Sequence, residues 1–211
     1  MALSLKYYSH YIALFVDVLG QKDKFELCPD PFEKDCLSLQ STKNIFIETN
    51  RAVAFVSDMV QKTFEQFATD DSEKIGSSYF SDCMVFYSPL YDKNEKINTY
   101  CLYQMLSFMA VAQTRFLAEG ITYRGGFEIG IGADNAPGGL YGPISYSVYD
   151  LESRIANYPR IVVGDKFRKL IDDIEFYELR MSPDGPSLAQ KLKQFYVFRD
   201  GAYMIDFLDR L

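Results

Sequence analysis

The order of apolar segments predicts an α+β fold, with helices packed on one face of a mostly antiparallel sheet. A nearly continuous apolar run over residues 11–20 predicts a buried strand. Apolar residues at helical spacing over 44–68 predict a long amphipathic helix, and two short apolar stretches meeting at Ser81-Asp82 predict a hairpin. Strand, helix, two strands, helix and strand in this order form the split β-α-β arrangement of ferredoxin-like palms.

The other elements follow from the same periodicities and from Gly and Pro positions. In chain order we expect a loop over 21–43, a helix over 97–119, a strand over 121–131, a flexible connection at Gly130, Gly132, Gly138 and Gly139, a helix over 145–157, a strand over 160–163 and, after Asp165, a short helix followed by strands near Phe176, Tyr196 and Tyr203.

Length and charge limit the function classes. The 211 residues fit one domain, which we divide into a core of about 10–165 and a C-terminal extension over 166–211. A net charge of -7 argues against nucleic acid as the partner. A single histidine, His10, makes a His-based triad or a multi-His metal site very hard to build. Without a signal peptide or a membrane-length apolar run, the expected compartment is the cytoplasm.

The four cysteines form no CxxC pair. Cys83 and Cys101 lie in apolar runs and are expected to be small buried residues. A bridge between Cys28 and Cys36 is open but is not the favoured interpretation.

Two acids interrupt strongly apolar sequence. Asp17 lies in the first predicted strand and Asp82 at the hairpin tip, and the split β-α-β topology makes these strands neighbours. Converging carboxylates need a neutralising cation, and an all-oxygen site suits Mg²⁺ or Mn²⁺. The alternative is that each acid caps a turn or pairs with a lysine.

Three segments resemble the catalytic domain of class III adenylyl and guanylyl cyclases over roughly residues 10–165. They are FVDVLGQKDKF, YFSDCMVF and GGLYGPISYSVYDLESRIANYPRIVV. Within that superfamily the last segment looks most like the bacterial Pycsar cyclases, which make cyclic UMP or cyclic CMP in anti-phage defence. The resemblance implies that Asp17, Asp82 and the backbone carbonyl of Val18 hold two metal ions, and that Arg160 binds the triphosphate. A solvated arginine is the alternative for Arg160.

The chain departs from the family pattern on the helix predicted over 145–157. The family has Asn and, four residues later, Arg at positions that are here Tyr146 and Asp150. Losing that arginine removes a cation from the transition state. Arg154, one turn further along the helix, is the first candidate to replace it and Arg124 the second, with a surface salt bridge as the alternative for both.

The base-reading positions also differ. By count they fall on Ser78 and Gly139, so neither the Lys-Asp adenine pair nor the Glu-Cys guanine pair is present. Tyr79, Phe80 or Tyr146 could contact the base, although core packing is the alternative for each. The GADNAPGG run lacks the Lys-Ser/Thr of a phosphate loop and is interpreted as a flexible connection.

The resemblance therefore implies a metal-dependent lyase, a uridylate or cytidylate cyclase, that converts UTP, or else CTP, to a 3′,5′-cyclic nucleotide and pyrophosphate. It implies a homodimer with active sites at the interface and a separate effector protein that reads the product. The alternative is a cyclase-like nucleotide-binding or dimeric interaction module with little or no turnover. A diguanylate cyclase is disfavoured because the chain has no GGDEF-like hairpin.

Overall fold

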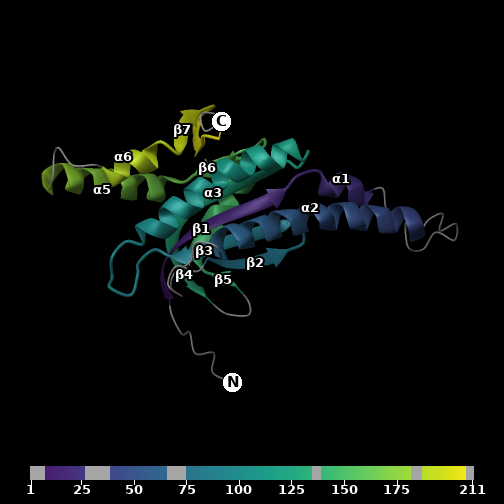
Figure 1. The fold of residues 1–211 in the computed structure, drawn as a ribbon, viewed down its shortest axis with the longest axis horizontal. Coiled ribbons are helices and arrows are strands. Elements are labelled where there is room, and N and C mark those ends of the chain that lie inside the picture. Colours follow the sequence, from purple (N-terminus) through teal and green to yellow (C-terminus); the bar gives the residue numbers. More distant parts are fainter. Residues whose placement is uncertain (1–7, 27–38, 66–74, 135–138, 182–186, 208–211) are drawn as a thin grey trace, which may run out of the picture.

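One sheet organises the chain, and its centre is the first strand. The computed structural model describes residues 8–26, 39–65, 75–134, 139–181 and 187–207. The strands are β1 (Tyr8–Val18), β2 (Gly76–Phe80), β3 (Cys83–Pro89), β4 (Tyr123–Asp134), β5 (Leu140–Tyr141), β6 (Ile161–Val163), β7 (Tyr196–Arg199) and β8 (Ala202–Ile205). The helices are α1 (Gln21–Glu26), α2 (Leu39–Glu65), α3 (Thr99–Ala118), α4 (Pro143–Asp150), α5 (Asp165–Met181) and α6 (Leu188–Lys193), and a π-helical turn (Leu151–Ile155) continues α4 (Figure 1).

The strand order is β2-β3-β1-β4-β6-β8-β7, and β5 pairs with β4. Among these pairs only β4 and β6 run parallel. The first four strands have the order of a split β-α-β unit, which confirms the predicted α+β fold with a mostly antiparallel sheet. β8 pairs with β6, so the C-terminal extension adds two strands to the same sheet.

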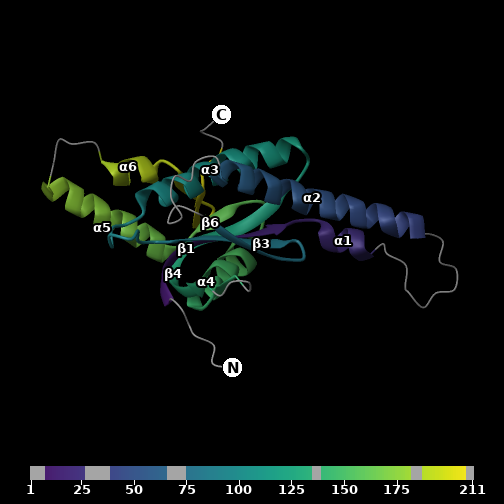
Figure 2. The same ribbon diagram turned by 60° about the horizontal axis from the view of Figure 1, so that its bottom comes forward.

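Helices α2, α3, α5 and α6 cover one face of the sheet, as predicted. Alternate residues of β1, such as Leu14 and Val16, point into this larger core together with Phe86, Phe116 and Phe167. Helix α4 lies on the opposite face, over a smaller core of Tyr11, Ala13, Tyr87, Leu140, Ile144 and Val148. Figure 2 shows α4 below the sheet and α2 and α3 above it.

Glycines on β4 let α4 approach this second face closely. A Cβ on Gly126 would lie 2.2 Å from the carbonyl oxygen of Val148 and 2.7 Å from Cβ of Leu151. A Cβ on Gly132 would lie 2.7 Å from the Ile144 side chain. The strand face under α4 thus needs glycine for packing, and the residues between these glycines are held close to the helix.

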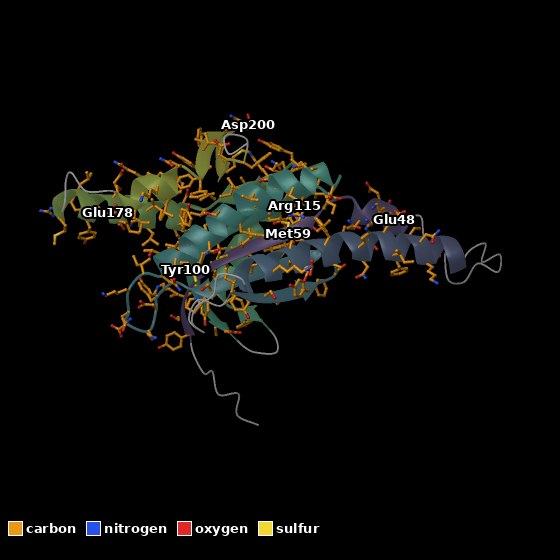
Figure 3. All side chains as sticks on the ribbon, in the orientation of Figure 1. Glu48, Met59, Tyr100, Arg115, Glu178 and Asp200 are labelled. Atoms are coloured by element: carbon orange, nitrogen blue, oxygen red, sulfur yellow. The ribbon has the colours of Figure 1, made fainter. Side chains whose placement is uncertain are left out.

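Helix α6 begins at a carboxylate from α5. Glu178 accepts hydrogen bonds from the backbone N–H groups of Leu188 and Ala189 and from the hydroxyl of Ser187, at 2.7 to 3.1 Å. Figure 3 shows Glu178 toward the end of α5, beside α6. These contacts satisfy backbone donors at the start of α6 and lower the pKa of Glu178 despite the opposing effect of burial.

Three local predictions are wrong. Helix α1 occupies the start of the expected loop over 21–43. Phe176 lies in the long helix α5 and not in a strand, because Phe167, Ile171 and Ile174 recur at helical spacing and hold α5 on the core. Gly130 and Gly132 lie inside β4 and not in a connection. Gly138, Cys28, Cys36 and the C-terminal end of the helix predicted over 44–68 lie outside the described residues.

Within the described ranges, none of the helices combines the length and the apolarity that a membrane crossing requires.

Candidate metal and nucleotide site

The hairpin tip brings Asp82 to the end of β1, where Asp17 lies. Asp17 is paired directly with Cys83 across β1 and β3, and Ser81 has a φ of 56° in the turn that precedes Asp82. The backbone N–H of Val18 donates to the carbonyl oxygen of Asp82 at 3.2 Å. One donor atom from each of Asp17, Asp82 and Cys83 lies within 4.8 Å of the others. The predicted convergence of the two acids is therefore present in the structure.

Arg124 and Glu152 complete this group, which we call the carboxylate cluster (Asp17, Asp82, Arg124 and Glu152). Arg124 lies on β4 directly opposite Asp17, and its Nη2 and Nε lie 3.3 and 3.4 Å from Oδ2 of Asp17. Its Nε also lies 2.5 Å from Oε1 of Glu152, an ion pair that lacks hydrogen-bond geometry. The side chain of Glu152 is only 3% exposed.

The electrostatics of the cluster oppose full ionisation. Burial raises the pKa of Asp17, the charge of Asp82 raises it further, and Arg124 acts in the opposite direction. Burial likewise raises the pKa of Glu152, which Arg124 counteracts and Asp17 reinforces. Three acids share one arginine, so the cluster has an excess of negative charge that a further cation would neutralise.

Cys83 belongs to the cluster as a neutral thiol. Burial, together with the charges of Asp17 and Asp82, raises the pKa of Cys83 to about 12. Its Sγ donates to Oδ1 of Asp17 at 3.6 Å. Metal-binding cysteines are thiolates, so a protonated Cys83 leaves the two carboxylates as the ligands and favours a hard, oxygen-seeking cation.

The donor set fits Mg²⁺ or Mn²⁺. Asp17 and Asp82 offer the carboxylate oxygens for such an ion. Such ions are bound by one or two carboxylates with the remaining positions left to water and phosphate oxygens. The predicted backbone ligand Val18 is buried, and its strand position places it next to Asp17.

A second feature lies on the same face of the sheet. A cavity of about 480 Å³ opens beside α4, and its lining includes Tyr146, Asp150, Lys166, Arg168 and Tyr203. The guanidinium carbon of Arg168 lies 3.8 Å from the Tyr203 ring centroid, and its Nη2 lies 2.6 Å from Asp165. Neither Asp17 nor Asp82 lines this cavity. On one chain, the metal-binding acids at the ends of β1 and β3 are thus separate from the cavity beside α4.

The two remaining predicted cations have partners within their own segment. Arg154 is exposed and pairs with Asp150 through a 2.8 Å contact between Nε and Oδ1. Arg160 is buried; its Nη2 donates to the carbonyl oxygen of Ile155 at 2.5 Å, and its Nη1 donates to the hydroxyl of Tyr158 at 3.0 Å. These contacts hold Arg160 against the end of the π-helical turn.

The predicted base-reading positions touch each other. Gly139 has a φ of 79°, and a Cβ there would lie 2.5 Å from Cβ and 2.7 Å from Oγ of Ser78. The neighbouring Tyr79 points to the other face of the sheet, where its hydroxyl accepts a hydrogen bond from Ser57 of α2 at 2.9 Å. The side chains of Ser78 and Tyr79 therefore lie on opposite faces of the sheet. The side chain of Phe80 is 83% exposed.

Glu152 was not among the residues predicted from the sequence. It follows the buried residues Ile144 and Val148 at steps of four, so it continues the inward stripe of α4. An acid at the next position of such a stripe needs a buried partner, and that is the signal which could have revealed it.

The fold is similar to that of a solved nucleotide cyclase catalytic core. The catalytic core of a rhodopsin-guanylyl cyclase with converted specificity, in complex with ATPαS, matches with a TM-score of 0.52 and 13% identity over 78% of this chain and 81% of that one. A class III adenylyl cyclase-like ATP-binding protein from Pseudomonas aeruginosa is 16% identical with a TM-score of 0.45, and the match covers 88% of this chain but 40% of that protein. No protein-family model and no curated protein matches the chain. The first likeness shows that the chain has the fold of a nucleotide cyclase catalytic core.

Proposed function

We propose that the protein is a metal-dependent nucleotide cyclase. The observation that carries the proposal is the meeting of the Asp17 and Asp82 carboxylates at one end of a cyclase-like sheet. Their oxygens would hold two Mg²⁺ or Mn²⁺ ions, with the backbone carbonyl of Val18 as a further ligand. Bound there, such ions lower the pKa of a hydroxyl and neutralise charge on phosphates.

The proposed reaction is an intramolecular displacement. The ribose 3′-oxygen of a nucleoside triphosphate bonds to the α-phosphorus, the bond to the bridging oxygen breaks, and pyrophosphate leaves with its electron pair. The 3′-hydroxyl proton goes to solvent, and a 3′,5′-cyclic nucleotide remains. The chain's part is to orient the triphosphate in line with the 3′-oxygen.

The proposed substrate is UTP, with CTP as second choice. This choice follows the resemblance to Pycsar cyclases, and the lack of a purine-reading pair at Ser78 and Gly139 is compatible with a pyrimidine. Tyr146 lines the cavity beside α4 and could stack on a base or ribose. By the resemblance to Pycsar cyclases, the product would be a second messenger for an effector protein in anti-phage defence.

The arrangement of the two features supports a homodimeric site. The carboxylate cluster and the cavity beside α4 lie apart on one chain, so one chain would supply the metal ligands and its partner the cavity. Of the predicted cations, Arg124 contacts the metal ligand Asp17 itself, and Arg154 and Arg160 would serve the triphosphate only after leaving their present partners.

A binding module without turnover is the second candidate. The observation that favours it is the ion pair between Arg154 and Asp150. This pair engages Arg154, the predicted cation nearest in sequence to position 150, where the family has its arginine. Such a protein would bind nucleotide and metal without releasing a cyclic product.

The test is mass spectrometry of the purified protein incubated with Mn²⁺ and each of the four ribonucleoside triphosphates. We expect cyclic UMP or cyclic CMP with an equal amount of pyrophosphate. If no triphosphate yields a cyclic product, the cyclase proposal fails. Calorimetry with a non-hydrolysable UTP analogue then identifies the binding module, since only that candidate predicts binding without product.

A further inference from the structure

We propose that Arg124 is the internal counter-cation of the carboxylate cluster, and that Glu152 is the positioning residue that withdraws Arg124 from Asp17 when a divalent cation binds. The proposal rests on the metal site proposed above but not on turnover. It assigns a role to the buried carboxylate of Glu152, which a metal site made of Asp17, Asp82 and Val18 leaves without one.

The starting geometry places one guanidinium between two acids. Arg124 contacts Oδ2 of Asp17 at 3.3 Å through Nη2 and Oε1 of Glu152 at 2.5 Å through Nε. The exposed fractions fall from 31% for Arg124 to 18% for Asp17 and 3% for Glu152. Asp17 is therefore reachable from solvent, while Glu152 lies behind it with Arg124 as its charge partner.

A divalent cation on Asp17 changes this balance. A metal ion and a guanidinium that share one carboxylate repel each other, and the repulsion is strong where water is scarce. Arg124 already touches a second acid, so it can give up Asp17 and keep an ionic partner. Without Glu152, leaving Asp17 would strand a half-buried positive charge, which is costly.

Glu152 is held in place while Arg124 has room to shift. The π-helical turn carries Glu152, and Gly126 brings that turn onto β4: a Cβ on Gly126 would lie 3.2 Å from the Glu152 nitrogen. π-Helical turns are frequent at functional sites. Arg124 has a long and partly exposed side chain, so it is the partner that can move between the two acids.

The same geometry argues against Glu152 as a metal ligand. Among the described residues, the group whose donor atoms lie within 4.8 Å of one another is Asp17, Asp82 and Cys83, and Glu152 is not in it. Nε of Arg124 lies against Oε1 of Glu152, so this oxygen already has a cationic partner.

The test measures Mn²⁺ binding by isothermal titration calorimetry in the absence of nucleotide. Arg124→Gln removes the competing cation and should tighten Mn²⁺ binding by about tenfold. Glu152→Gln leaves Arg124 on Asp17 and should weaken it by about tenfold. In the Arg124→Gln background, Glu152→Gln should change the affinity by less than about threefold, because the residue it acts through is gone.

Two results of this cycle would overturn the proposal. An equal effect of Glu152→Gln in both backgrounds means that Glu152 acts only as a nearby charge. A larger effect in the Arg124→Gln background means that Glu152 is itself a ligand. Asp58→Asn, which removes an exposed acid of α2 paired with Lys62, is the matched control and should leave the affinity unchanged.

A second measurement needs no folded double variant. The ¹⁵N signal of the Arg124 Nε–H group, identified by its absence in Arg124→Lys, is followed as Mg²⁺ is added to the unaltered protein. It should shift in step with saturation, and an unmoved signal at saturation contradicts the proposal. If the unaltered protein binds neither ion, the metal site and this inference fail together. If it binds metal as described but yields no cyclic nucleotide, the cyclase proposal alone fails.

Discussion

Two acids on the same face of the sheet, Asp17 and Glu128, have different surroundings. Asp17 lies at the end of β1, and its carboxylate accepts hydrogen bonds from the side chains of Arg124 and Cys83. Glu128 lies on β4 and accepts hydrogen bonds from the backbone N–H groups of Ile129, Lys166 and Phe167. Burial is the largest cause that raises the pKa of both carboxyls. What distinguishes them is the kind of partner that opposes it.

The partners of Glu128 cannot move away. Two of its three donors belong to the first turn of α5. The carboxylate therefore satisfies backbone groups that the helix leaves unpaired, and its negative charge interacts favourably with the positive end of the helix dipole. The partners of Asp17 are a flexible arginine and a thiol, and Asp82 adds like charge. The comparison indicates that Glu128 serves the fold and that Asp17 is available to a ligand.

The largest expected effect is the loss of activity when Asp17 is replaced. Asp17→Asn keeps the shape of the side chain but removes its charge, so a divalent ion loses a ligand. We expect cyclic nucleotide formation to fall by about 10³-fold or more, in line with removal of a charged group that stabilises the transition state. Asp82→Asn should do the same, and product formation is followed by mass spectrometry.

The control for this prediction is Asp58→Asn. Asp58 is an exposed acid of α2 that pairs with Lys62, and it is not part of the carboxylate cluster. This variant should keep full activity. If Asp17→Asn and Asp82→Asn both retain activity, the two acids do not hold the metal.

Replacing Glu128 should mainly lower the stability of the fold, whereas replacing Asp17 should mainly lower activity. Glu128→Ala leaves three backbone N–H groups without an acceptor, one of them buried, and we expect the free energy of unfolding to fall by about 3 kcal/mol. Asp17→Asn, measured with EDTA by urea denaturation, should lose far less because its carboxylate is poorly stabilised. A larger loss for Asp17→Asn than for Glu128→Ala would reverse the roles assigned to the two acids.

Gly126, which lies between Arg124 and Glu128 on β4, gives the next effect. Gly126→Ala places a Cβ against the Val148 carbonyl and Leu151, so α4 and its π-helical turn must move. Overpacking of this kind costs about 2 kcal/mol, and Mn²⁺ binding should weaken with it because Glu152 moves too. Gly130→Ala is the matched control, since its Cβ would meet the Ile144 side chain at a milder 3.3 Å. Similar losses for both variants would argue against a specific role of Gly126.

The sequence was enough to predict the meeting of Asp17 and Asp82, because each acid interrupts an apolar run and the topology makes the strands neighbours. These features depend on local patterns and on the order of elements, which a sequence displays directly.

The partners of each charge could not be predicted. Arg124 lies opposite Asp17 because of the register between β1 and β4, and a shift by one residue would place it on the other face. Glu152 reaches the cluster through the π-helical turn and the close approach at Gly126, neither of which has a reliable sequence pattern. The partner of Arg160, a carbonyl oxygen of the same segment, depends on the exact path of the chain after that turn.

The smallest expected effect is a pH dependence of stability that belongs to Asp17. Its folded pKa lies above the ordinary value of 3.8, so between these two values the folded chain binds more protons than the unfolded chain. The free energy of unfolding should therefore fall as pH rises through this window, and Asp17→Asn should make that fall shallower. Urea denaturation from pH 4 upward in EDTA measures both slopes, and Asp58→Asn should reproduce that of the unaltered protein. A steeper fall in Asp17→Asn would mean that Arg124 outweighs burial and Asp82, and that Asp17, like Glu128, is held mainly by its partners.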